Sequence, residues 1–216
     1  MCNLYRCLTT QEAMRRMFRV KPERDRLGNY APAEGIWPDK DAPVVRTGRD
    51  GERELAALRW GFPSPEPKGR PVTNARNLSS PFWRAWIGKP EFRCLVPATA
   101  FAEPHPTRKD SRGWVDNEWF ELPDTDVFAF AGVWRPWDGP RSIGNRQKET
   151  REWHLFAILT CPPNALVAPI HPKAMPAILH REDHERWLAA PWDEAATLVR
   201  PYPPDEMGIA ASSRGL

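Results

Sequence analysis

The chain has 216 residues and a formal net charge of +3, with 41% hydrophobic and 27% charged residues. These proportions are typical of a folded globular protein and exclude a chain that is disordered throughout. Proline is unusually frequent, at 25 residues. Because a proline ends a helix or removes a ladder hydrogen bond, this count excludes a long helical bundle and favours short strands joined by turns.

The charge is unevenly distributed along the chain. Residues 1–112 carry 21 Lys and Arg against 13 Asp and Glu, whereas residues 113–216 carry 10 against 15. Of the 31 basic residues 24 are arginines, whose planar guanidinium suits phosphates and stacking on bases. A nucleic-acid partner fits this pattern, but a genome that prefers arginine codons explains it equally well.

Short apolar runs bounded by Gly, Pro, Asn or Asp recur along the chain and predict strands. In chain order these runs are 3–7, 43–49, 52–62, 92–98, 119–122, 127–134, 153–160 and 174–179. Two gaps between them, Asp50-Gly51 and Pro123–Asp126, carry turn signals, and each predicts a hairpin. Residues 104–118 and 135–151 are polar and predict exposed loops.

Helical signals are few. Thr9 and Glu12 form a capping box that predicts a helix ending near Phe18. A short helix is expected after Pro162–Asn164, and a third over Arg181–Ala190.

The chain has neither internal repeats nor a domain linker, and turns rather than long crossover helices join its strands. We therefore expect a single α+β domain over residues 1–216, with a mainly antiparallel, barrel-like sheet and a few peripheral helices. Residues 191–216 are expected to form an irregular tail.

Cysteine and histidine spacing gives no metal signature. The four cysteines lack C-x-x-C spacing, and His180 and His184 lie in HREDH rather than H-E-x-x-H. We expect free thiols, no metal and no cofactor. With no signal peptide and no apolar stretch longer than Val127–Trp134, we expect a soluble, cytoplasmic monomer that does not enter membranes.

Cys2 has the most distinctive chemistry. Removal of Met1 would leave an α-amine and a thiol on one residue, with unperturbed pKa values of about 7.7–8.0 and about 8.5. An aldehyde would form an imine with the amine, and the thiol would then close a five-membered thiazolidine. The alternative is a chance cysteine at a frayed terminus.

Four further residues carry groups that such chemistry needs. Glu103 ends an apolar run, where poor solvation raises the pKa of a carboxyl toward a useful acid/base value. His171 also ends an apolar run and is a candidate general acid/base. Asn74 and Arg76, in VTNARN, could orient an amine and hold a phosphate. Each residue also has an ordinary structural interpretation at a strand end, a core hydrogen bond or a turn.

Several short motifs follow one another in a fixed order. They are Met1-Cys2, Asn29–Pro32, Trp60–Phe62, Asn74–Arg76, Arg93–Ala98 with Glu103, Phe130–Trp134, and Ile170-His171 with Met175-Pro176. In this order they resemble the SRAP family (SOS response-associated peptidase domain) over about residues 1–190. The resemblance implies a compact α+β domain around an antiparallel barrel-like sheet, in agreement with the residue pattern.

The resemblance also implies a function in the DNA damage response, near the nucleoid. The resemblance implies that Met1 is removed autocatalytically and that Cys2 forms a covalent thiazolidine with the ring-opened aldehyde of an abasic site in single-stranded DNA. The implied catalytic set is Cys2 as nucleophile, Asn74 to orient its amine, Glu103 as acid/base and His171 to assist sugar opening. The implied DNA contacts are Arg76 and Lys173 to phosphate and Trp60 and Pro32 to bases.

The sequence departs from the family pattern at three places. Asn3-Leu4 stands where the family often has Gly-Arg, and Pro104 stands where it commonly has Trp. The segment after His171 is one residue longer and carries Lys173 instead of Arg. A lysine at that position provides a point charge without the bidentate fork of arginine.

Two other functions remain open from the sequence. The first is a thiol peptidase that uses Cys2, His171 and Glu103 on other proteins, and it predicts turnover of peptides. The second is a non-catalytic module that binds single-stranded nucleic acid, with salt-sensitive affinity that depends neither on an abasic site nor on Cys2.

Overall fold

The computed structural model describes residues 2–64, 69–144 and 147–210. Five strands form a closed barrel: β4 (Asp41–Thr47), β5 (Arg53–Trp60), β7 (Arg93–Ala98), β10 (Phe128–Gly144) and β11 (Gln147–Cys161). They pair antiparallel in the order β5–β4–β7–β10–β11, and a parallel pairing of β11 with β5 closes the ring. The predicted α+β fold with a mainly antiparallel, barrel-like sheet is confirmed.

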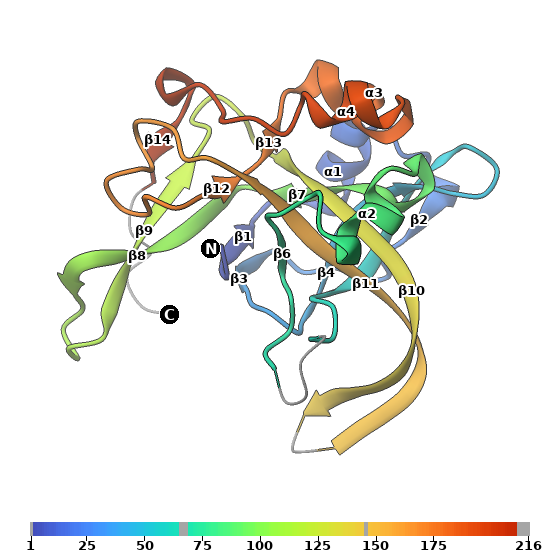
Figure 1. Cartoon of the computed structure of the whole chain (residues 1–216), viewed down its shortest axis with the longest axis horizontal. Coiled ribbons are helices and arrows are strands. Elements are labelled where there is room, and N and C mark those ends of the chain that lie inside the picture. The colour runs from blue at the N-terminus through green and yellow to red at the C-terminus, as the bar shows by residue number, and fades with distance from the viewer. Residues whose placement is uncertain (1, 65–68, 145–146, 211–216) are drawn as a thin grey trace.

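Short strands extend the barrel at its edges (Figure 1). They are β2 (Asp25–Arg26), β6 (Asn74–Ala75), β12 (Met175–Pro176) and β13 (Ile178–Leu179). β6 pairs in parallel with β11, with Asn74 opposite Ile158. This pairing fixes the position of Asn74 at the barrel wall.

A second, antiparallel sheet has the strand order β14–β9–β8–β1–β3. Its members are β1 (Tyr5–Cys7), β3 (Ala33–Ile36), β8 (Ala100–Lys109), β9 (Val115–Glu121) and β14 (Gly208–Ile209). The two sheets share a core, since the ring of Tyr5 packs edge-on against the rings of Trp60 and Phe130. The ring centroids lie 5.1 Å and 5.7 Å apart, respectively. β1 therefore anchors the first residues of the chain against the barrel.

The helices are short and peripheral, as expected (Figure 1). They are α1 (Gln11–Phe18), α2 (Pro81–Ile87), α3 (His184–Ala189) and α4 (Trp192–Ala196), with 3₁₀ turns η1 (Pro22–Arg24), η2 (Pro90–Phe92), η3 (Arg181–Asp183) and η4 (Pro204–Glu206). The N-cap of α1 is Thr10, whose hydroxyl accepts from the amide of Ala13 at 3.1 Å, rather than the predicted Thr9.

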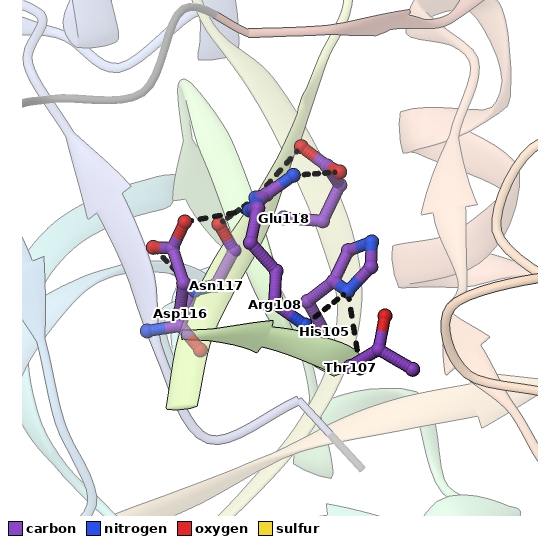
Figure 2. Close-up of polar contacts among 6 residues, drawn as sticks. All are labelled: His105, Thr107, Arg108, Asp116, Asn117 and Glu118. Atoms are coloured by element: carbon purple, nitrogen blue, oxygen red, sulfur yellow. Dashed lines mark hydrogen bonds and ion pairs between the residues drawn. The ribbon is translucent and has the colours of Figure 1, made fainter. Parts of the chain in front are cut away.

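The predicted loop over 104–118 is wrong, because β8 and β9 form a hairpin that projects from the second sheet (Figure 1). Arg108 links the two strands: it donates to Asp116 at 2.6 Å, to Glu118 at 2.8 Å and to the carbonyl of Asn117 at 2.9 Å (Figure 2). The pairing register shifts between Pro104 and Lys109. Polar cross-strand pairs and a prolyl bulge leave little apolar alternation for a sequence pattern to detect.

The predicted loop over 135–151 is also wrong in its described part, since residues 135–144 of β10 pair with residues 147–155 of β11. Residues 145–146 lie outside the described residues. The predicted hairpin around Pro123–Asp126 does not form: residues 119–121 pair with β8, and residues 128–133 pair with β7. The turn joins the two sheets instead.

The C-terminal third is more finely divided than expected. Turns, held by the side-chain oxygen of Asn164 and the amides of Leu166 and Val167, replace the helix predicted after Asn164. The strand predicted over 174–179 divides into β12 and β13, and the third helix divides into η3 and α3. The segment expected to be an irregular tail contains α4, η4 and β14, which pairs with β9.

Two features are absent from the described residues. No helix there is long and apolar enough to cross a membrane. Nor do three or more His, Cys, Asp or Glu side chains there gather in a group that could hold a metal ion.

Candidate active site

Cys2 lies immediately before β1 and is fully buried. The amide of Ala102 in β8 donates to the carbonyl of Leu4 at 3.0 Å, so the pairing of β1 with β8 extends toward the start of the chain. The Cys2 thiol donates to the carbonyl of Leu4 at 3.5 Å. All four cysteines are buried free thiols, as predicted.

Asn74 contacts Cys2 directly. Its Nδ2 donates to the carbonyl of Cys2 at 2.9 Å and to the hydroxyl of Thr73 at 2.9 Å. Its Oδ1 is buried and accepts no hydrogen bond from the described part of the chain. The site thus contains a buried acceptor that is available for a new donor.

Glu103 reaches the same place from β8 and is fully buried. Burial raises the pKa of its carboxyl from the ordinary 4.5 to about 7. Burial, and secondarily the charge of Glu103, raises the pKa of the Cys2 thiol well above its usual range. The thiol is therefore protonated at neutral pH in the intact chain.

His171 follows a run of turns after β11, and its Nε2 lies 3.9 Å from Oε2 of Glu103. The carbonyl of Ala174, which can only accept, lies 2.8 Å from Nδ1, closer than the Ala174 amide at 3.2 Å. We therefore assign the ring proton to Nδ1, which leaves Nε2 as an acceptor toward Glu103. Burial lowers the pKa of His171. Burial thus shifts both groups toward their neutral forms, and one bridging water would bring them within reach of proton transfer.

Two exposed cationic residues lie beside this cluster. Arg76 follows β6, and its Nη2 donates to the carbonyl of Lys173 at 2.9 Å. The side chains of Arg76 and Lys173 are both exposed. This contact joins the segment that carries Asn74 to the one that carries His171.

The predicted contact between Trp60 and DNA bases is wrong, because Trp60 is fully buried. Its indole Nε1 donates to the carbonyl of Thr73 at 3.0 Å, and its ring stacks against Phe156. Trp60 therefore supports the segment that carries Asn74. Pro32 is exposed, and its base contact stays a prediction. Met1, whose removal was predicted, lies outside the described residues.

The structure adds two residues that the sequence did not indicate. The hydroxyl of Thr73 donates to Oδ1 of Asn3 at 3.1 Å and accepts from Asn74. Thr73 precedes a recognisable motif and Asn3 follows Cys2, but no sequence spacing links residue 3 to residue 73.

The chain as a whole matches one known protein family. The family model for "SOS response associated peptidase (SRAP)" matches residues 1–214. The chain belongs to the SRAP family. SRAP membership associates it with the SOS response and hence with a DNA-related function.

Several solved structures share the fold of this SRAP protein. A protein from Bordetella bronchiseptica is 26% identical, with a TM-score of 0.74 over 97% of this chain and 98% of that one. A Bacteroides thetaiotaomicron protein, at 21% identity, gives a TM-score of 0.71 over 96% and 90% of the two chains. A phage-related protein from B. bronchiseptica is 22% identical and gives a TM-score of 0.70 over 97% of this chain and 93% of that one. The latter two show the fold alone. No curated protein matches the sequence.

Proposed function

We propose that this SRAP protein forms a covalent thiazolidine crosslink with abasic sites in single-stranded DNA, through Cys2 after autocatalytic removal of Met1. The observation that carries the proposal is a chain of three functional groups that begins at Cys2, in which Asn74 and Glu103 act on Cys2 and His171 lies next to Glu103. Asn74 donates to the Cys2 carbonyl at 2.9 Å, the charge of Glu103 acts on the Cys2 thiol, and His171 lies 3.9 Å from Glu103.

The chemistry balances without a cofactor. Hydrolysis of the Met1–Cys2 peptide bond consumes one water and frees the α-amine. The amine attacks the aldehyde carbon of the ring-opened sugar, and loss of one water gives an imine. The Cys2 sulfur then bonds to that carbon while its proton passes to the nitrogen, which closes the thiazolidine.

The state of the Cys2 thiol supports this order of steps. Its raised pKa keeps it protonated in the buried site, so it is a poor initial nucleophile. The free amine therefore attacks first, and ring closure requires a base that accepts the thiol proton. A thiol peptidase would need a thiolate, and the raised pKa of the Cys2 thiol therefore favours crosslinking over peptidase activity.

Glu103 and His171 are suited to the proton transfers. An abasic site is mostly a closed hemiacetal, so opening it needs an acid/base pair that works at neutral pH. A carboxyl with a pKa of about 7 can both donate and accept a proton there. His171, with its proton on Nδ1, can receive one at Nε2.

The exposed side chains of Arg76 and Lys173 support single-stranded DNA as the substrate. Phosphates on either side of an abasic site need cationic partners. The two residues lie at the edge of the cluster, joined by the 2.9 Å contact.

The test is incubation with a single-stranded oligonucleotide that carries one abasic site, followed by denaturing electrophoresis. We expect an adduct with the wild-type protein and none with Cys2→Ala. Cys7→Ala is the matched control, since Cys7 is also a buried thiol in the first segment of the chain. Equal crosslinking by Cys2→Ala and wild type would overturn the proposal.

A further inference from the structure

Three side chains form a continuous hydrogen-bond relay next to Cys2. Nδ2 of Asn74 donates to the hydroxyl of Thr73 at 2.9 Å, and that hydroxyl donates to Oδ1 of Asn3 at 3.1 Å. We propose that Thr73 and Asn3 are positioning residues that hold the amide of Asn74 in the orientation that the reaction of Cys2 requires. This inference rests on the proposed crosslinking function.

The donors and acceptors of the relay can be arranged in only one way. Oδ1 of Asn3 can only accept, so the one hydroxyl proton of Thr73 is committed to it. The Thr73 oxygen is then free to accept from Asn74. Both N–H bonds of the Asn74 amide are thereby used, one on Thr73 and one on the carbonyl of Cys2.

This arrangement turns Oδ1 of Asn74 away from the carbonyl of Cys2. Rotating the amide by half a turn would put two acceptor oxygens against each other. In the observed orientation, Oδ1 is buried and takes no hydrogen bond from the described residues. It is available to accept from the α-amine of residue 2, which exists only once Met1 has been removed.

The two ends of the relay belong to different parts of the fold. The carbonyl of Thr73 accepts from the amide of Ile158 and from the indole of Trp60, each at 3.0 Å, so Thr73 is fixed to the barrel wall. Asn3 lies between Cys2 and β1, the strand of the second sheet that begins at Tyr5. The relay therefore couples the segment that carries the nucleophile to the one that carries Asn74.

This coupling depends on the side chain at residue 3. A glycine at position 3 would offer no side-chain acceptor for the Thr73 hydroxyl. Asn3 thus supplies the acceptor that orients the Thr73 hydroxyl.

The experiment measures adduct formation under single-turnover conditions, as a function of DNA concentration. Thr73→Val keeps the shape of the side chain but removes both relay bonds. We expect its saturating rate to fall about five- to tenfold, the value of one hydrogen bond, while its DNA affinity is unchanged. Thr73→Ser should restore the rate, and Asn3→Ala should show a smaller fall of about two- to threefold.

Thr99→Val is the matched control. The Thr99 hydroxyl accepts from the amide of Leu8 and donates to the carbonyl of Arg6, at the far end of β1 from Cys2. This variant should lose similar stability and keep the wild-type saturating rate.

The outcomes separate the two proposals. If wild type forms the adduct and Thr73→Val saturates at the same rate, the relay has no positioning role and only this inference fails. The same holds if Thr73→Val and Thr99→Val slow the reaction equally. If wild type forms no adduct, the proposed function fails and the positioning role fails with it.

Discussion

Replacing Glu103 with glutamine tests the electrostatics of the site through stability alone. The folded-state pKa of about 7, against an ordinary value of 4.5, means that ionising this buried carboxyl costs the folded state about 3 kcal/mol. Below pH 4.5 the carboxyl is protonated in both states, so there is no cost. As the pH rises from 4.5 to above 7, the free energy of unfolding of the wild type falls by this cost. Glu103→Gln cannot ionise, so its free energy of unfolding does not fall for this reason.

We therefore expect the melting temperature of Glu103→Gln relative to wild type to rise between pH 4.5 and pH 8. At about 2–4 °C per kcal/mol for a chain of this length, the relative gain is about 6–12 °C. Differential scanning fluorimetry across this range measures it. Glu118→Gln, directly opposite on β9, removes a carboxylate that is paired with Arg108 and should destabilise instead. A stability difference between Glu103→Gln and wild type that does not change with pH would refute the assigned environment of Glu103.

Three further predictions follow from the placement of single residues. Arg76→Ala should weaken binding to single-stranded DNA and reduce the slope of log affinity against log salt by about 1. Arg16→Ala, which replaces an exposed arginine on α1, should have neither effect. Equal slopes for Arg76→Ala and wild type would show that Arg76 does not bind a phosphate. Trp60→Phe should lower stability by about 1–3 kcal/mol, because the Thr73 carbonyl loses one of its two donors and the smaller ring leaves a cavity in the core. The DNA affinity of the folded protein should not change. A weaker affinity at an unchanged melting temperature would instead support a contact between Trp60 and DNA bases. Cys2 should react with a thiol reagent in the native state only after Met1 has been removed, because it is fully buried in the intact chain; fast reaction of a form extended ahead of Met1 would contradict this.

The sequence predicted those parts of the fold in which one local signal dominates. Asp50-Gly51 set the first hairpin, where Gly51 adopts a φ of +82°. The apolar run over 92–98 became β7, which is buried throughout. Polar pairs such as Arg108 with Asp116 and Glu118 carry no such signal, so the hairpin of β8 and β9 was missed.

The candidate site could be predicted only through the family resemblance. Cys2 and Asn74 are 72 residues apart, and no spacing rule brings them together. The error at Trp60 could have been avoided, since the sequence alternates the apolar Leu58 and Trp60, which are both buried, with the charged and only half-buried Arg59. This alternation already indicated that Trp60 faces the core. The relay through Thr73 depends on tertiary pairing of β6 with β11 and has no local signature.

Intact-mass spectrometry combined with thiol counting tests the central claim most directly. We expect the purified protein to lack Met1 and, after reaction with the abasic oligonucleotide, to gain the mass of the DNA less one water. An imine has that same mass, so the adduct is then denatured and its free thiols are counted. A thiazolidine leaves three of the four cysteines free, which is the predicted result. Four free thiols in the adduct, or a protein that retains Met1 and yields no adduct, would contradict the account.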